Sequence, residues 1–303
     1  MNTPTHTNSL SGFLSAMAAF LIWGLCPIYW KVLAAIPAIE TISHRVVWSV
    51  LFLVPVISMQ GKWPEFFQVI REPRKVAVLC LTTLLVASNW LLFIWSVNNN
   101  HIIEASLGYY INPIANVVFG VIILRERLNR PQRIAVGLAV AGVLYLTFQY
   151  GRFPVIALTL AITFSLYGLL RKILGINSAV GLFIETLLLT LPCIAYLVWL
   201  ENQGIGSFGH TGFTIDLFLM GTAFLTALPL LLFNIAANRI TLTAVGFIQY
   251  ISPTATLLLA VFLYHEPLST DQLVAFIFIW AALVIYSVDS IKIYKKQRVA
   301  LHP

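Results

Sequence analysis

Long apolar segments recur along the whole chain and alternate with short polar stretches. Each segment is close to the ~20 residues that an α-helix needs to cross the hydrocarbon core of a bilayer. The longest intervening loops, near 60–74 and 201–214, are too short to be folded domains. The pattern predicts ten membrane-spanning helices, at residues 12–33, 38–59, 75–97, 102–123, 131–150, 154–174, 178–200, 215–237, 243–264 and 271–290.

Composition supports an all-α integral membrane protein. Hydrophobic residues make up 59% of the 303 positions and charged residues only 10%, whereas soluble domains carry about 25% charged residues. A mean hydropathy of +0.90 over this length is too high for one buried core. The three cysteines lie far apart in apolar segments, so they are interpreted as small hydrophobic residues. We expect no metal and no cofactor.

The net charge of +7 is explained by its distribution along the chain. If both termini are cytoplasmic, fifteen of the eighteen Lys and Arg, including Arg171, fall on the cytoplasmic side. Lys31 and Arg152 fall outside, and Arg45 lies within a span. This bias predicts cytoplasmic tails at 1–11 and 291–303. The partner of the basic surface is therefore the lipid bilayer and not a nucleic acid.

An internal repeat appears when the chain is shifted by 140 residues. The segment "YYINPIANVVFGVIILRERL" at 109–128 then aligns without a gap with "QYISPTATLLLAVFLYHEPL" at 249–268. The repeat unit has five helices, which predicts repeats at 12–150 and 151–290. Because five is odd, the second copy crosses the membrane in the opposite sense. Inverted repeats of this kind build many secondary transporters, whose substrate sites lie near the midplane at the repeat interface.

Polar residues share one face of the fourth predicted span. Tyr109, Asn112 and Asn116 follow helical spacing, and the shifted positions in the ninth span include Gln249 and Ser252. Such a stripe is costly against lipid. It is explained either by a cavity that the residues line or by hydrogen bonds that join helices.

Two prolines lie near the middle of the same spans. Pro113 and Pro253 leave the carbonyls of Tyr109 and Gln249 without their helical partners. We predict helix breaks that expose these carbonyls to a cavity, with a packed kink as the alternative. Asn89 and Trp90 in the third span and Asn234 in the eighth are deep enough to line the same site.

Arg45 is the charged residue that most needs an explanation. It lies in "ISHRVVWS", on one helix face with Trp48 and next to His44. Glu185 occupies the corresponding position in the second repeat, and Glu104 lies nearer the outer interface. Arg45 is either the structural partner of one of these glutamates or the cationic handle for a substrate carboxylate or carbonyl. Glu126 and Glu266, at span ends, are interpreted as caps of helix N-termini.

Several stretches resemble the EamA-type drug/metabolite transporters, and more closely their RarD branch. They are "ETISHRVVWS" at 40–49, "NWLLFIWSVN" at 89–98, "EASLGYYINPIANVVFGVIILRERL" at 104–128, "SLYGLLRK" at 165–172 and "GFIQYISP" at 246–253. The resemblance implies a ten-helix permease whose central cavity is lined by the first four helices of each repeat. Tyr167 and Tyr250 lie in these stretches and join the candidate cavity residues.

The expected function is that of a bacterial inner-membrane secondary transporter. It would move a small polar or amphipathic metabolite or drug by alternating access, most simply by export, and chloramphenicol-like amides are candidate ligands. Smaller relatives couple export to protons through a glutamate in their first helix, which the first span here lacks, so proton coupling would require Glu185 or Glu104. An importer or facilitator, and a non-transporting scaffold, are the alternatives. No HExxH, CxxC or G-x-S-x-G motif indicates an enzyme. Oligomeric state is left open.

Overall fold

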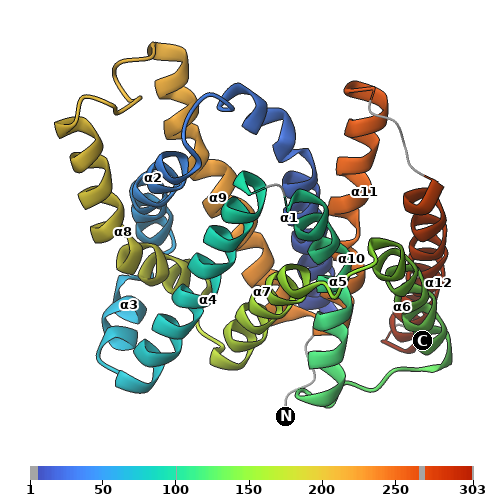
Figure 1. Cartoon of the computed structure of the whole chain (residues 1–303). Helices are drawn as coiled ribbons and strands as arrows, with labels where there is room; N and C mark the ends of the chain where they lie inside the picture. The colour runs from blue at the N-terminus through green and yellow to red at the C-terminus, as the bar shows by residue number, and fades with distance from the viewer. Residues whose placement is uncertain (1–5, 100, 266–269, 302–303) are drawn as a thin grey trace.

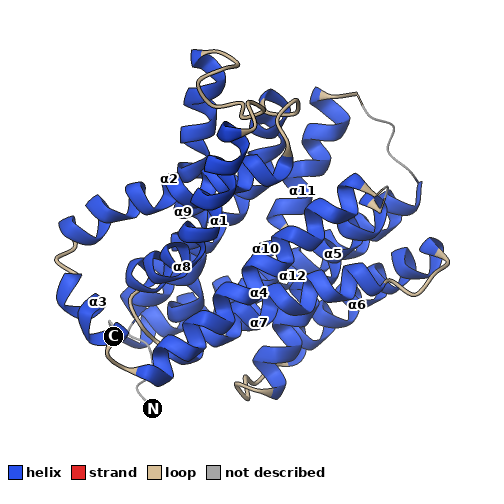
Figure 2. Ribbon diagram, turned by 60° about the vertical axis from the view of Figure 1, so that its left-hand side comes forward, coloured by secondary structure: helices blue, strands red, loops and turns tan. Residues whose placement is uncertain are grey.

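The computed structural model describes residues 6–99, 101–265 and 270–301. Within these ranges the chain is helical and contains no strand (Figures 1 and 2). The helices are α1 (His6–Val32), α2 (Ala38–Met59), α3 (Trp63–Ile70), α4 (Pro73–Asn98), α5 (Ile102–Ile122), α6 (Arg130–Tyr150), α7 (Val155–Leu174), α8 (Ser178–Asn202), α9 (Phe213–Arg239), α10 (Leu242–Gln249), α11 (Ile251–Leu258), the π-helix η1 (Leu259–Leu263) and α12 (Thr270–Leu301).

The prediction of ten spans is confirmed within the described residues. Ten helical stretches are long and apolar enough to cross a bilayer, and each begins and ends within three residues of its predicted limits. The described chain differs at both ends, where α1 already begins at His6 and α12 continues to Leu301, through much of the expected tails. The 60–74 loop contains α3, a short helix with Pro64 in its first turn.

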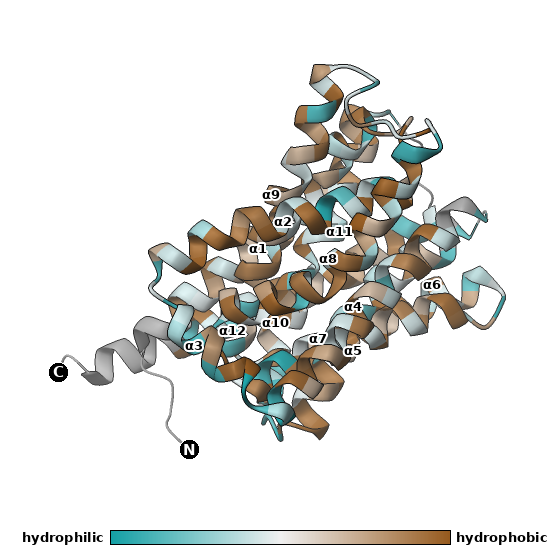
Figure 3. Cartoon of the chain, turned by 90° about the vertical axis from the view of Figure 1, so that its left-hand side faces the viewer, coloured by the Kyte–Doolittle hydropathy of each residue, from teal (hydrophilic) through white to brown (hydrophobic). Residues whose placement is uncertain are grey.

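The hydropathy of the surface fits this arrangement. In Figure 3 apolar residues dominate the flanks of the helices, and polar residues gather in the connections at their ends. Only 22–44% of the residues in each candidate span are buried within the bundle. The remaining apolar side chains are those that lipid would cover.

Contacts between helices recur when each helix is exchanged for its counterpart 140 residues away in the chain. The α1–α9 contact corresponds to α7–α4, the α5–α7 contact to α11–α1, and the α2–α9 contact to α8–α4. Three further contacts, α2–α8, α5–α10 and α6–α12, join a helix to its own counterpart. The α6–α12 pair lies at one edge of the bundle (Figure 1), so the fifth and tenth spans are peripheral.

The backbone repeats an unusual feature at the same offset. Among the described residues, Arg125 and His265 are the non-glycine residues with positive φ, and both have φ of 55°. They stand at matching positions after the fourth span of each repeat. A left-handed conformation costs a non-glycine residue about 1–2 kcal/mol. In the turn after α5, the residue that follows Arg125 is Glu126, which accepts a hydrogen bond from the first N–H group of α10. This contact stabilises the strained turn.

The two prolines behave differently. The ninth span is interrupted at Tyr250, between α10 and α11, just before Pro253. The predicted break at Pro113 is wrong, because α5 runs through it as one helix. Neighbouring helices pack against α5 on both sides of the proline, α7 at Gly108 and α10 at Gly120. Gly246 of α10 packs so closely that a Cβ there would lie 2.5 Å from the Pro113 carbonyl oxygen.

Candidate functional site

Arg45 lies in α2 among residues from three other helices. Its Nε donates a hydrogen bond of 2.8 Å to Thr226 Oγ1 in α9. Its guanidinium carbon lies 5.0 Å from the ring centre of Trp30 in α1 and 4.9 Å from that of Trp90 in α4. These distances are within the range of cation–π attraction. Two indole rings and a hydroxyl therefore surround the charge.

The expected glutamate partners are not at Arg45. Among the described residues, no carboxylate oxygen lies within 4.0 Å of its guanidinium. In the part of the chain that the structure describes, no side chain or carbonyl accepts a hydrogen bond from the two terminal nitrogens of Arg45. These nitrogens are also not among the described, fully buried side-chain atoms that lack a hydrogen-bond partner. They are therefore unpaired and not fully enclosed. The pairing with Glu185 or Glu104 that was one interpretation of the sequence does not form here.

Tyr109 of α5 is a third aromatic residue near Arg45, in addition to Trp30 and Trp90. It lies close enough to interact electrostatically with Arg45, and its side chain is 48% exposed. Trp30, Arg45 and Trp90 are also partly exposed. We call these four residues together with Thr226 the Arg45 site. Trp30 and Thr226 were missed in the sequence, because nothing local marks which face of α1 or α9 meets α2.

A pocket adjoins the Arg45 site. The space is narrow in this conformation, with an enclosed volume of about 10 Å³, and it shares Trp90 and Thr226 with that site. Its wall also contains Tyr167 and Glu185. The other lining residues are Val46, Val86, Leu182, Thr186, Leu189 and Leu230. The cationic site thus borders a mostly apolar space between α2, α4, α7, α8 and α9.

Glu185 is buried in a polar cluster of its own. Thr82 Oγ1 donates to it at 2.6 Å, Tyr167 OH donates at 3.2 Å, and Arg171 Nε lies 3.8 Å away. Asn234 accepts from Arg171 Nε at 3.3 Å and donates to Tyr167 OH at 3.0 Å. Arg171 and Glu185 are 1% and 2% exposed. The counter-ion of Glu185 is therefore Arg171 and not Arg45.

Arg171 was assigned to the cytoplasmic side from its position at the end of a span, and its burial was missed. The last turn of α7 directs it inward, where Nη2 donates to the Ser178 carbonyl at 3.2 Å. Its guanidinium fills the space beside Gly181, where a Cβ would lie 1.6 Å from Nη1. A glycine at that position is the sequence signal that could have indicated a large neighbour.

The polar stripe of the fourth span joins the two repeats. Asn116 Nδ2 donates to Gln249 Oε1 at 2.7 Å, and Gln249 Nε2 donates to Asn112 Oδ1. Asn112 Nδ2 donates to the Ala161 carbonyl at 2.9 Å. The three amide side chains are at most 6% exposed. In this conformation they hold α5, α7 and α10 together, whereas Tyr109 on the same face is open.

Other candidate residues lie away from Arg45. Asn89 donates to the Leu160 carbonyl and to Thr163 Oγ1, both at 2.8 Å, and so joins α4 to α7. His44 and Trp48 pack on the ring of Phe208, in the loop between α8 and α9. Ser252 packs against α1, where a Cβ on Gly24 would lie 2.8 Å from its carbonyl oxygen.

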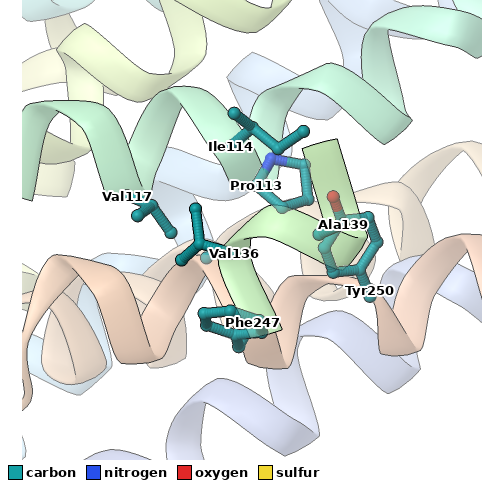
Figure 4. Close-up of a pocket in the computed structure, with 8 residues that line it drawn as sticks. Pro113, Ile114, Val117, Val136, Ala139, Phe247 and Tyr250 are labelled. Atoms are coloured by element: carbon teal, nitrogen blue, oxygen red, sulfur yellow. The ribbon is translucent and has the colours of Figure 1, made fainter. Parts of the chain in front are cut away.

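Pro113 and Tyr250 line a second, apolar pocket between α5, α6 and α10 (Figure 4). Its empty volume is about 200 Å³, and its other lining residues are Ile114, Val117, Val136, Ala139, Gly246 and Phe247. Tyr250 is 1% exposed and donates to the Tyr110 carbonyl at 3.2 Å. The structure thus places this tyrosine in helix packing and not beside Arg45.

The buried Glu104 and the half-buried Glu126 accept hydrogen bonds from backbone N–H groups. Glu104 accepts from Ile156 N at 2.7 Å and from Tyr150 OH at 3.0 Å. Glu126 accepts from Leu242 N at 2.6 Å and Thr243 N at 2.9 Å. Its predicted capping role is therefore confirmed, although the capped helix is α10 of the other repeat and not the next helix in the chain. Glu266 lies outside the described residues.

These features define a class. A bundle of ten apolar spans, with a free cationic group at membrane depth beside an internal pocket, is the architecture of a multi-pass membrane transporter.

Comparison with known proteins agrees. The chain belongs to the EamA-like transporter family, which it matches twice, over residues 10–148 and 153–288. It is 44% identical to an uncharacterized transporter of Vibrio cholerae, with 96% of each chain covered. It is 43% identical to protein RarD of Escherichia coli K12, with 92% of this chain and 95% of that protein covered. The resemblance to the RarD branch is confirmed at this level.

More distant relatives agree as well. The chain is 28% identical to the chloramphenicol-sensitive protein RarD of Pseudomonas aeruginosa, with 94% and 96% of the two chains covered. One crystal structure matches with a TM-score of 0.72 at 17% identity, with 92% of this chain and 98% of that chain covered. At this identity the structural match supports the fold alone.

Proposed function

We propose that this transporter is a bacterial inner-membrane permease that carries a small polar or amphipathic metabolite by alternating access, with the Arg45 site on the substrate path. The observation that carries the proposal is the free end of the Arg45 guanidinium. Its terminal nitrogens have no partner among the described residues and are not fully enclosed, and the neighbouring Trp90 and Thr226 line a pocket. In this proposal the N- and C-termini are cytoplasmic, which the bias of Lys and Arg along the chain supports.

The position of Arg45 within the span supports a functional role. It lies seven residues after the start of α2 at Ala38, which is about 10 Å along a helix that rises about 1.5 Å per residue. An arginine at the centre of a span costs about 2.5–3.5 kcal/mol even on insertion scales, and position 45 lies about 5 Å short of that centre. A purely structural arginine would be expected to pair with an acid, as Arg171 does.

The interfaces between the repeats support alternating access. Glu126 of the first repeat accepts hydrogen bonds from the first N–H groups of α10 in the second repeat. Within the second repeat, Lys172 of α7 donates to the carbonyl of Ala237 at the end of α9. An anion at a helix N-terminus and a cation at a C-terminus both stabilise the helix dipoles. In the proposed cycle, the contact between Glu126 and α10 joins the two repeats and separates when the carrier opens to the cytoplasm.

Export is the direction we favour, and the same geometry would serve an importer or facilitator. Glu185 and Glu104 already accept hydrogen bonds from several donors. This favours a facilitator or exchanger over proton coupling at either residue. Chloramphenicol is a candidate ligand because one relative is named a chloramphenicol-sensitive protein.

Cysteine accessibility tests whether the Arg45 site is an aqueous path. Tyr109→Cys and Val118→Cys are made in a chain whose three native cysteines are replaced by serine. The wild-type residues are 48% and 42% exposed, and both lie in α5. A charged thiol reagent should label position 109 rapidly and position 118 slowly, because the second faces lipid. Equal labelling would remove the case for a path, and flux in proteoliposomes then separates a carrier from a scaffold.

A further inference from the structure

We infer that the ligand of the Arg45 site is an organic anion, bound through a planar carboxylate, with an apolar or aromatic body. This inference rests on the proposed transport function, because it names the class of molecule that the path would carry. The sequence left a carboxylate and a neutral carbonyl as alternatives for Arg45. The contacts of the surrounding acids and of Arg45 itself decide between them.

The acids within reach of the bundle interior are bound elsewhere. Glu40 accepts from Ser207 N at 2.6 Å and from Ser207 Oγ at 3.0 Å. Glu104 is bound by Tyr150 and Ile156, as described above, and Glu185 by Arg171, Thr82 and Tyr167. None of these carboxylates lies within 4.0 Å of Arg45. The Arg45 site therefore carries an uncompensated positive charge.

An anion removes this imbalance and a neutral ligand does not. A charge inside a low-dielectric region is costly unless it is paired and hydrogen-bonded. The binding of a carboxylate supplies the missing countercharge, whereas an amide or ketone supplies only a dipole. A cationic ligand would be repelled. Charge alone thus ranks the three classes of ligand as anion, neutral and cation.

The donors of Arg45 also favour a carboxylate. Its Nε is occupied by Thr226, while the two terminal nitrogens remain free. Two parallel N–H groups match the two oxygens of one carboxylate, and such charge-assisted pairs are roughly twice as strong as neutral hydrogen bonds. A single amide oxygen uses this fork less completely. The two unoccupied nitrogens of Arg45 therefore suit a carboxylate that binds through both of its oxygens.

The aromatic side chains indicate the rest of the ligand. Trp30 and Trp90 lie against the guanidinium, and Tyr109 is open beside it. Half of the residues that line the adjoining pocket are aliphatic, and two more are aromatic. This wall is apolar enough to contact an aryl or alkyl group attached to the carboxylate when the narrow space opens during transport. The expected ligand is thus an amphipathic monoanion and not a polyanion such as a phosphate ester.

The test compares three probes of one shape on the purified full-length protein in detergent. Benzoate, benzamide and benzylamine are an anion, a neutral amide and a cation, and binding is read from the fluorescence of the tryptophans. In the unmodified protein, benzoate should bind at least tenfold more tightly than benzamide, and benzylamine should not bind. Arg45→Gln should weaken benzoate binding at least tenfold. Arg45→Lys should restore only part of it, since lysine lacks the fork. Arg152→Gln, which removes an exposed cation outside the spans, should change nothing.

Each other outcome overturns the inference. Benzamide binding as tightly as benzoate would show a carbonyl site, and benzoate binding that survives Arg45→Gln would place the anion elsewhere. Absence of binding by all three probes at millimolar concentration would also reject it. The probe comparison needs no variant, so it holds even where an Arg45 variant fails to fold. The cysteine labelling at position 109 is independent, so the path can be confirmed while this ligand class is rejected.

Discussion

Arg45 and Arg171 both place a guanidinium inside the bundle, but their surroundings differ in charge. Arg171 lies 3.8 Å from Glu185 and is 1% exposed, whereas Arg45 has two indole rings and a hydroxyl around it. Removal of one member of a buried ion pair leaves the other charge alone. The two arginines should therefore respond differently to substitution, Arg171 through stability and Arg45 through binding.

The first prediction concerns the Glu185 cluster. Glu185→Gln should lower the free energy of unfolding by about 3–5 kcal/mol, because Arg171 stays buried without its counter-ion. The double variant Glu185→Gln/Arg171→Gln should recover much of this loss. The fraction of monodisperse protein after heating in detergent measures both. Recovery with Arg45→Gln in place of Arg171→Gln would contradict the assignment of the pair.

The second prediction concerns Gly181. A Cβ at this position would lie 1.6 Å from Arg171 Nη1 and 2.4 Å from its Cζ, so the whole guanidinium would have to move away from Glu185. Gly181→Ala should therefore lower the midpoint of heat-induced aggregation. Gly137→Ala is the matched control, because nothing lies within 4 Å of a Cβ there. That change should be neutral or stabilising, by up to about 1 kcal/mol. Equal midpoints for the two variants would refute the prediction.

At the scale of elements, carboxylates join the start of one helix to a distant part of the chain. Glu126 in the turn after α5 caps α10, and Glu65 in α3 accepts from the N–H of Asn177, the N-cap residue of α8, at 2.9 Å. Free N–H groups at a helix start need such acceptors. These contacts place the short helix α3 against α8 outside the membrane-spanning segments.

The third prediction follows from Glu65. Burial raises the pKa of its carboxyl, but the hydrogen bonds from Asn177 and Lys62 lower it more, so the pKa lies below its ordinary value. The contribution to stability is therefore present above the unfolded pKa of about 4.3 and is lost as pH falls through the folded pKa. Glu65→Gln should lower stability at pH 7 by about 1 kcal/mol, and this difference should shrink below about pH 4.

Thermal scans of the two proteins from pH 7 to pH 3.5 measure this effect. Glu72→Gln is the control, since its half-exposed carboxylate pairs with Lys75 but makes no side-chain cap hydrogen bond to α4, and it is expected to add little to stability. A constant difference between wild type and Glu65→Gln over the whole pH range would show that the carboxyl does not contribute through its charge.

At the scale of the whole molecule, the prediction is the orientation in the membrane. Tags at residue 1, in the 60–74 loop and at residue 303 should be reached only from the cytoplasm, and a tag in the 201–214 loop only from outside. The physical reason is the retention of Lys and Arg on the cytoplasmic side. Protease protection in right-side-out and inverted vesicles measures it. A 60–74 loop that is cleaved from outside the cell would reverse the orientation.

The spans and the 140-residue offset could be read from the sequence because both depend on local composition. A bilayer requires about twenty apolar residues in a helix wherever they stand in the chain. The polar stripe of Tyr109, Asn112 and Asn116 was visible for the same reason. Its role was not, because hydrogen bonding to Gln249 depends on how α5 and α10 are rotated against each other.

The tertiary structure alone decided which charges meet. Arg45 binds Thr226, 181 residues away, and Arg171 meets Glu185 although its position at the end of a span indicated a solvated side chain. Hydropathy reports how deep a residue lies along the membrane normal, but not which side of its helix faces a neighbour. The number and limits of the spans were therefore determined by the sequence itself, whereas the free guanidinium at Arg45 emerged only from the packing of α1, α2, α4 and α9.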